Sequence, residues 1–160
     1  MGVSDHLGAS DHEQADDSYD GDTVYGWYQR GMELLASGNA HSAAIVLARL
    51  KQVDSSPSVL EAYARALFDA AQYQDAIGAF EELVERSPDA DYGHFGLGMS
   101  YWRTQRFIKA RDHLAMAMVM RPDRPEYANA LSQVKATLRA RVEAGLPLEG
   151  AIVADFGSRE

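Results

Sequence analysis

The sequence contains no cysteine, which excludes disulfides, thiolate metal sites, iron–sulfur clusters and a cysteine nucleophile. It also lacks a run of about 18 apolar residues, the length that a helix needs to cross a bilayer. The opening residues, MGVSDHLGASDHE, carry neither the basic segment nor the apolar core of a signal peptide. These absences predict a soluble, cytoplasmic protein that does not enter a membrane, and a length of 160 residues predicts one domain.

Lysine and arginine are missing from residues 1–24, which carry seven of the 24 acidic residues. The remaining chain has 17 acidic against 15 basic residues, so most of the net charge of −9 belongs to this segment. Ten basic residues follow from Arg103 onward, a field too weak to indicate a nucleic-acid partner. Because residues 1–23 have few large apolar side chains, we expect them to form an acidic disordered tail.

Sustained alternation of apolar and polar residues, which would indicate strands, is also missing. Apolar residues instead recur at spacings of three and four, and Gly, Asn or Pro interrupts them at short intervals. This pattern predicts an all-α domain over residues 24–144, followed by a C-terminal tail over 145–160. The expected helices span 24–36, 40–53, 57–70, 73–86, 91–103, 107–119 and 124–144.

An internal repeat organises these helices. Ala43, Ala76 and Ala110 are 33 and 34 residues apart, and each precedes a large apolar residue by four positions. Pro88 and Pro122 are again separated by 34 residues. A period of about 34 residues indicates stacked helix pairs, none of which can bury its apolar face alone. The units span about 24–56, 57–90 and 91–124.

The residues that carry this period resemble the tetratricopeptide repeat family. In the first unit the matching residues are Trp27, Gly31, Leu34, Gly38, Ala43 and Leu47, whereas Arg30 stands where a leucine is usual. The second unit, which lacks the tryptophan and glycine at its start, matches at Leu60, Ala64, Leu67, Tyr73, Ala76, Phe80 and Pro88. The third unit matches at Leu97, Gly98, Tyr101, Phe107, Ala110, Leu114, Ala117 and Pro122. The resemblance implies an α-solenoid of three helix-turn-helix repeats.

The last helix, over about 124–144, is predicted to cap the solenoid. Pro125 lies near its start and Gly145 just beyond its end, as helix boundaries favour. Its predicted buried stripe is Tyr127, Leu131, Val134, Leu138 and Val142, opposite a solvent face of Gln133, Lys135, Arg139 and Arg141. We also expect Met116, Met118 and Met120 to be buried against this helix.

No group of residues predicts catalysis. The histidines His6, His12, His41, His94 and His113 lack metal-ligand spacing, and we expect them in the tail or on the surface. Glu81, Glu82 and Glu85 are typical of a solvated helix face. The stretch DDSYDGD at 16–22 is similar to a calcium loop, but Trp27 stands where the closing glutamate should be. We therefore expect no enzymatic activity, no metal and no cofactor.

The family resemblance implies a concave surface, lined by the first helix of each unit, that holds an extended peptide. Members that bind acidic chaperone C-termini have Lys and Asn on this surface, and this sequence does not. An apolar or aromatic peptide is therefore the expected partner, because aromatic side chains dominate the predicted surface. The residues assigned to this surface are Tyr28, Met32, Leu35, Glu61, Arg65, Asp69, Tyr92, Phe95, Gly96, Met99, Trp102 and Arg103.

Three glycines in the third unit receive separate interpretations. Gly98 is predicted to let the paired helices touch, and Gly93 to allow close stacking on the preceding unit. Gly96 is predicted to face the concave groove, so that Gly96→Leu would preserve folding and weaken binding.

Two other functions remain open at this stage. The stretch HFGLGMSYWRTQRFIKA is similar to three-repeat chaperones of type III secretion, which makes a small secretion or assembly chaperone one alternative. The other is a scaffold that self-associates, and the chain is expected to be a monomer or a weak homo-oligomer. The apolar segment Ala151–Phe156 could also lie in the groove of its own or a neighbouring molecule, and the acidic tail could rest on the basic C-terminal half or in the groove.

Overall fold

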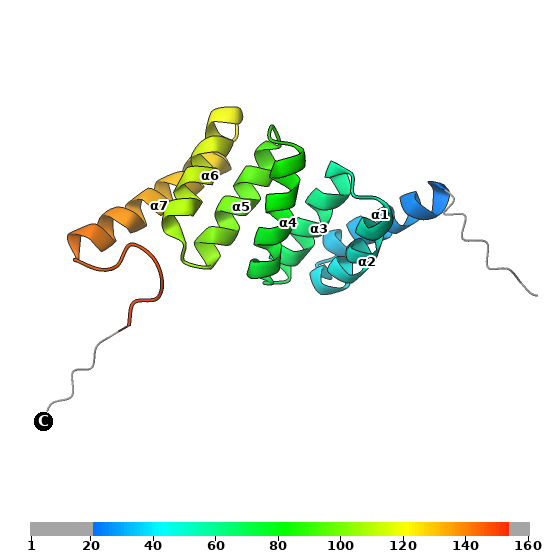
Figure 1. Cartoon of the computed structure of the whole chain (residues 1–160), viewed down its shortest axis with the longest axis horizontal. Helices are drawn as coiled ribbons and strands as arrows, with labels where there is room; N and C mark the ends of the chain where they lie inside the picture. Colours follow the sequence, from blue (N-terminus) through cyan, green and yellow to red (C-terminus); the bar gives the residue numbers. More distant parts are fainter. Residues whose placement is uncertain (1–20, 154–160) are drawn as a thin grey trace, which may run out of the picture.

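The computed structural model describes residues 21–153, with side chains from residue 23 onward, and over this range it contains only helices (Figure 1). The all-α solenoid is therefore confirmed. The first helix begins three residues before the predicted position, and every other boundary lies within one residue of its prediction. Residues 1–20, with most of the calcium-like stretch, lie outside the described range. The helices are α1 (Gly21–Ala36), α2 (Ala40–Val53), α3 (Pro57–Asp69), α4 (Tyr73–Arg86), α5 (Asp91–Arg103), α6 (Phe107–Met120) and α7 (Pro125–Glu143).

The turn inside each helix pair has the same backbone conformation. Gly38, Ala71 and Gln105 all have a positive φ, at 79°, 59° and 60°. In each turn the next amide donates to a carbonyl five residues earlier, as Asn39 does to Leu34 at 2.8 Å. A residue in this left-handed conformation ends a helix, because the amides of the turn then donate hydrogen bonds to the last carbonyls of the helix. Only the first of the three units has glycine at this position. The repeat is therefore visible in backbone geometry where the residue types differ.

The helices pack side by side in chain order, as a row that has two layers (Figure 1). Besides sequential neighbours, the only direct contacts among the described helices join α1 to α3, α3 to α5, and α5 to α7. The odd-numbered helices are thus closer together than the even-numbered ones, which makes theirs the inner, concave layer of a curved stack. The predicted assignment of the first helix of each unit to the concave side is consistent with this layering.

Small residues bring the paired helices together as the repeat pattern predicts. A Cβ added to Gly31 would lie 2.6 Å from Leu47 Cδ2, and one added to Gly98 would lie 2.7 Å from Leu114 Cγ. Both leucines are fully buried. At Gly93 an added Cβ would lie 3.0 Å from Val84 of the preceding unit. The interpretations of Gly93 and Gly98 are confirmed, since each accommodates a neighbouring side chain.

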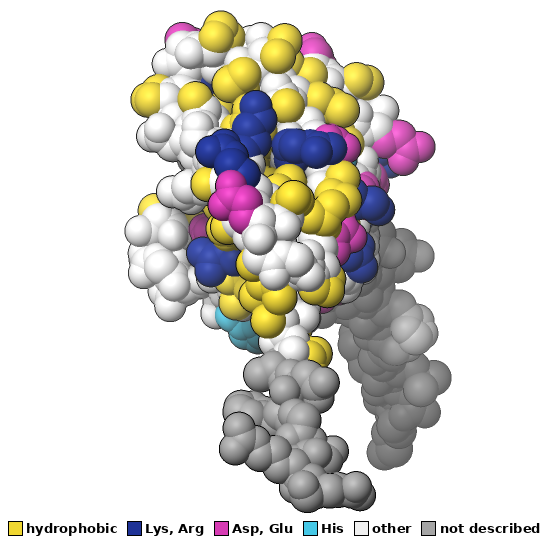
Figure 2. Space-filling model, turned by 90° about the vertical axis from the view of Figure 1, so that its left-hand side faces the viewer, with side chains coloured by type: hydrophobic (Ala, Val, Ile, Leu, Met, Phe, Trp, Pro, Cys, Tyr) yellow, Lys and Arg dark blue, Asp and Glu magenta, His cyan; other side chains and the backbone are white. Residues whose placement is uncertain are grey.

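The capping helix α7 buries a different stripe from the predicted one. Tyr127, Leu131, Val134 and Leu138 are buried as expected. Arg141 is also buried, at 7% exposure, whereas Val142 is 64% exposed. The prediction for these last two residues was wrong because the last turn of α7 faces the chain that follows it. The remaining solvent face of α7 is basic, and Figure 2 shows Lys and Arg side chains gathered across this end of the molecule.

Arg141 fastens residues 144–150 to the body of the protein. Its Nη1 donates to the carbonyls of Pro147 and Gly150, each at 2.9 Å, and its guanidinium lies 4.7 Å from the centre of the Phe107 ring. The Gly150 amide in turn donates to the Gln105 carbonyl at 3.0 Å. Residues 144–150, called the strap below, are therefore fixed to the α5–α6 turn.

The methionine cluster on α6 is not buried as predicted. Met118 is partly buried against the core, but Met116 is 44% exposed and Met120 is 38% exposed. The prediction failed because α7 covers only one side of α6, and these two side chains lie on the other. None of the described helices is long and apolar enough to cross a membrane.

Candidate functional site

Four of the predicted groove residues surround one depression on the concave side. Tyr28 and Met32 come from α1, and Glu61 and Arg65 come from α3. The depression has a volume of about 170 Å³. Tyr28 and Met32 are partly buried and pack on the core, whereas the two charged side chains are exposed. We call this depression the α1–α3 pocket; it combines an apolar wall with a charged one.

The charged wall consists of Glu61 and Arg65, and the carboxylate of Asp91 acts on Glu61 from outside the lining. Burial raises the pKa of Glu61, the nearby Asp91 carboxylate raises it further, and the Arg65 guanidinium opposes both. Arg65 is only partly available to Glu61, because its Nε also lies 3.7 Å from an Asp69 carboxylate oxygen. A cationic group placed beside Glu61 would therefore relieve repulsion between carboxylates.

The predicted aromatic residues of α5 lie farther along the concave layer and are wedged between helices. Phe95 stacks on Tyr127 of α7 with ring centres 4.7 Å apart. Trp102 meets Phe107 edge to face at 5.2 Å. The ring of Tyr92 meets the ring of Phe80 on α4 edge to face, with ring centres 6.3 Å apart. With Met99 these side chains are partly buried against the core, so each offers only part of its surface to a ligand.

Two residues assigned to the groove are part of the core. Leu35 is only 7% exposed. A Cβ on Gly96 would lie 2.7 Å from Phe80 Cε2 and closer still to two other atoms of that ring. Both assignments were wrong: each residue lies on a helix of the concave layer, but on the side that packs against its neighbours. The expectation that Gly96→Leu preserves folding is therefore overturned.

The remaining predicted residue, Arg103, lies at the end of α5 and points toward the second unit. Its guanidinium is 6.0 Å from the Phe68 ring and 5.6 Å from the Tyr73 ring. Sequence reasoning missed Asp91, which accepts a 2.6 Å hydrogen bond from the Tyr127 hydroxyl. Nothing in the repeat pattern signals this bond, because Tyr127 lies 36 residues after Asp91, in the capping helix and outside the repeats.

A pair of histidines lies away from the α1–α3 pocket. The Nδ1 atoms of His94 and His113 are 3.3 Å apart, and His94 Nε2 lies 3.0 Å from the Pro88 carbonyl. Since a carbonyl can only accept, Nε2 of a neutral His94 carries the proton and His113 donates through Nδ1. His94 is 8% exposed, so its prediction as a surface residue was wrong. Within the described residues, no three His, Asp or Glu side chains could together hold a metal ion.

Because of the histidine pair, we expect the free energy of unfolding to decrease in mild acid. Burial lowers the pKa of His113, the adjacent His94 lowers it further, and Asp112 and Glu81 partly oppose this shift. A folded-state pKa below the unfolded value of 6.5 means that the unfolded chain binds protons first as the pH falls. The free energy of unfolding should therefore decrease from pH 6.5 down to the folded-state pKa and then level off.

Denaturant unfolding of the chain at several values between about pH 5 and 8 measures this effect. We expect His113→Gln to flatten the dependence. His41→Gln is the matched control, because His41 is exposed on α2, where its Nδ1 lies 3.2 Å from Gln72 Nε2. An unchanged slope in His113→Gln would contradict the assignment.

Comparison with known proteins gives one family. The family model described as a tetratricopeptide repeat matches residues 62–125, which include most of the second and third units. No curated protein has a matching sequence.

Solved structures extend the likeness to most of the chain. The first tetratricopeptide repeat domain of Spaghetti (RPAP3), bound to the HSP90 peptide SRMEEVD, has 16% identity and a TM-score of 0.71 over 75% of this chain and 96% of that one. The Sgt2 repeat domain from Aspergillus fumigatus has 14% identity and a TM-score of 0.71, covering 84% and 91%. The type III secretion translocator chaperone SycD from Yersinia enterocolitica has 18% identity and a TM-score of 0.65, covering 81% and 98%. At these identities the likeness concerns the fold.

Proposed function

Because the chain is a tetratricopeptide repeat protein, we propose that it is a protein-interaction module whose concave layer binds an extended peptide. Solenoids of stacked helix pairs present a long concave surface to their partners. Structural neighbours include repeat domains bound to peptides of HSP90 and HSP70. Binding of a peptide is thus an established use of this fold, and the residues of the groove decide which peptide fits.

The α1–α3 pocket is the observation that carries the proposal. Residues from two different repeats converge there, with Tyr28 and Met32 opposite Glu61 and Arg65. An apolar side chain of the peptide would fit against Tyr28 and Met32. A neighbouring basic side chain would lie beside Glu61, where the burial that raises the pKa of the carboxyl also strengthens attraction to a cation.

The same charges argue against an acidic ligand. The HSP90 peptide bound by Spaghetti, SRMEEVD, contains three acidic residues. In this chain Glu61 and Asp91 lie near the pocket, and Arg65 is shared with Asp69. The preferred peptide therefore combines apolar or aromatic residues with a lysine or arginine, and its continuation would run over the partly exposed Phe95, Met99 and Trp102.

A displayed library of random linear peptides provides the test without a known partner. The full chain selects binders, and one selected peptide is titrated calorimetrically against variants. We expect Glu61→Lys to weaken binding about tenfold, which corresponds to roughly 1.4 kcal/mol. Tyr28→Ala should weaken binding by a similar factor because it removes the apolar wall.

Glu85→Lys is the matched control, since Glu85 is also exposed but lies on α4 in the outer layer. It makes the same charge change and should leave the affinity unaltered. Equal affinity of the selected peptide for the original chain, Glu61→Lys and Tyr28→Ala would exclude the pocket as the binding site. Failure of the library to yield any binder would count against the peptide-binding function itself.

The secretion-chaperone alternative stays a prediction from sequence. The likeness to SycD extends over most of both chains, but at 18% identity it concerns the fold alone. Self-association through the concave layer would be detected in the same titrations, because the heat of dilution of the chain would depend on its concentration.

A further inference from the structure

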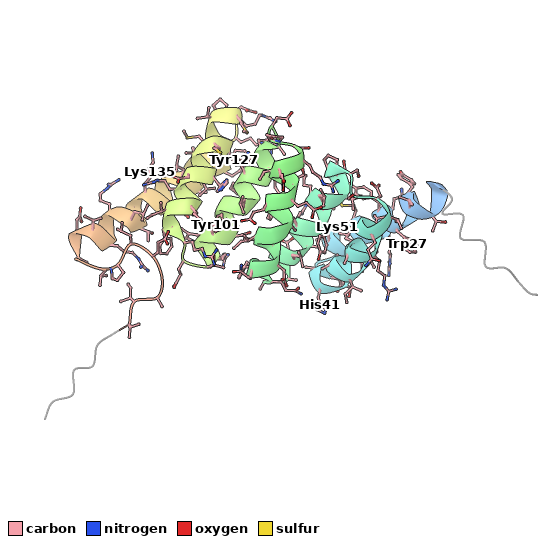
Figure 3. All side chains as sticks on the ribbon, viewed as in Figure 1. Trp27, His41, Lys51, Tyr101, Tyr127 and Lys135 are labelled. Carbon is pink, nitrogen blue, oxygen red and sulfur yellow. The ribbon has the colours of Figure 1, made fainter. Side chains whose placement is uncertain are left out.

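The outer end of the first repeat has an open hollow between α1 and α2. Its lining is Trp27, Arg30, Val46 and Arg49, and its volume is about 260 Å³. Among the described helices α1 contacts only α2 and α3, so no other helix covers this end. At the opposite end α7 supplies the polar cover that a stack of repeats requires. Figure 3 shows the separation, with Trp27 at one end of the row and Lys135 at the other.

The two arginines of this hollow have little negative charge around them. Arg49 is exposed and forms no ion pair with any residue that the structure describes. Arg30 approaches only Glu33, at 3.7 Å, and both side chains are more than 60% exposed. By contrast Lys51, one turn beyond the hollow, is 2.5 Å from a Glu82 carboxylate oxygen. The hollow is therefore an apolar surface flanked by two cations that can accept an anionic partner.

An anionic segment precedes α1 in the sequence. Residues 1–20 contain six acidic residues and no lysine or arginine, and they lead directly into α1 at Gly21. Arg30 lies nine residues into the helix, a rise of roughly 13 Å. Four residues of extended chain span about the same distance, which brings Asp16 and Asp17 within reach of Arg30. The charge and the length of residues 1–20 are therefore both suited to covering the hollow.

We propose that residues 1–20 fold back over the hollow and form the N-terminal cap of the solenoid. Carboxylates of the segment pair with Arg30 and Arg49, and its few apolar side chains, Val3, Leu7 and Tyr19, cover Trp27 and Val46. This cap is separate from the peptide groove, because Arg30 and Arg49 do not line the α1–α3 pocket. The acidic segment then has a structural role within its own chain.

The absence of cysteine allows a direct test in the full chain. A nitroxide attached at Ser10→Cys should broaden the backbone amide signals of Val46 and Arg49, reducing their intensity by more than half. Arg30→Glu combined with Arg49→Glu should restore the intensity, as should 1 M salt, at which the Debye length is about 3 Å. Adding Glu13→Lys, Asp16→Lys and Asp17→Lys should recover the broadening in the charge-reversed chain.

Controls separate the proposed cap from other occupants. Lys135→Glu with Arg139→Glu makes the same charge change at the opposite end and should leave the broadening intact. In a second sample, chains that carry the nitroxide but no nitrogen-15 are mixed with nitrogen-15 chains that lack the nitroxide. The signals of this mixture should show no broadening. Broadening in the mixture would identify a second copy as the occupant and overturn the proposal. Full intensity in the singly labelled chain, or broadening that persists after charge reversal, would also overturn it.

Discussion

Gly96→Leu is expected to destabilise the protein by about 3 kcal/mol, the upper end of the usual cost of overpacking a core. The reason is Phe80, which is 1% exposed and occupies the space that a Cβ at position 96 would need. The ring also packs edge to face against Tyr92, with ring centres 6.3 Å apart, so a shift of the ring would disturb a second contact. Urea unfolding, read as a shift of the midpoint at constant slope, measures the loss.

Gly78→Leu makes the same substitution in an open helix position. Nothing lies within 4 Å of a Cβ at Gly78, so this variant should gain up to about 1 kcal/mol from helix propensity. The double variant Phe80→Ala/Gly96→Leu should lose less stability than the sum of the losses in the two single variants. The reason is that the added leucine fills the space that the phenylalanine ring vacates. Equal unfolding midpoints for Gly96→Leu and Gly78→Leu would show that Gly96 faces the groove after all.

Arg141→Met is expected to cost about 3 kcal/mol, because hydrogen bonds from a buried charged group contribute roughly 1.5–3 kcal/mol each. The methionine keeps most of the apolar stem but cannot donate to the Pro147 and Gly150 carbonyls. Its contact with the Phe107 ring also loses the charge. Besides global unfolding, hydrogen exchange of the Gly150 amide reports on the strap, since that amide donates to Gln105.

Arg139→Met is the control for this prediction. Arg139 is two residues earlier on α7 and exposed, so its replacement should change stability by less than about 0.5 kcal/mol. If Arg141→Met unfolded at the same urea concentration as Arg139→Met and the Gly150 amide kept its protection, the strap would not depend on the buried arginine.

The helix pairs could be predicted because their signals are local and recur three times. The alanines at 43, 76 and 110 mark positions where two backbones meet, and Gly31 and Gly98 mark the facing positions. Such contacts occur within one unit, so a single sequence contains both partners at a fixed spacing. The boundaries agreed closely for the same reason, since each turn repeats one conformation.

The errors in the site arise where contacts cross from one unit to the next. Helix register places Gly96 in the concave layer, but it does not reveal that Phe80 from the preceding unit extends beneath it. Leu35 was also misassigned, since helix register placed it on the concave side although it is buried. The bond from Tyr127 to Asp91 joins the third unit to the capping helix, which lies outside the repeat period. The histidine pair lies within the third unit, between α5 and α6, at positions that the repeat pattern does not mark.

The end of the solenoid was predicted least well, because repeat symmetry stops there. Val142 continues the apolar spacing of α7 yet is exposed, and Arg141 is buried because the strap returns over it. Met116 and Met120 are exposed because they lie on the side of α6 that α7 does not cover. Composition alone does not indicate that an arginine will be enclosed by carbonyls of its own chain.

The strap also determines how the protein would respond to a mechanical load. A force applied to the chain beyond Val153 would reach Gly150 before it reaches α7, and Gly150 is held by Gln105 and Arg141. Tension would therefore be shared between the turn that joins α5 to α6, through Gln105, and the last turn of α7, through Arg141. A load applied at this end would thus reach the third repeat directly through the strap, and not only through the last helix.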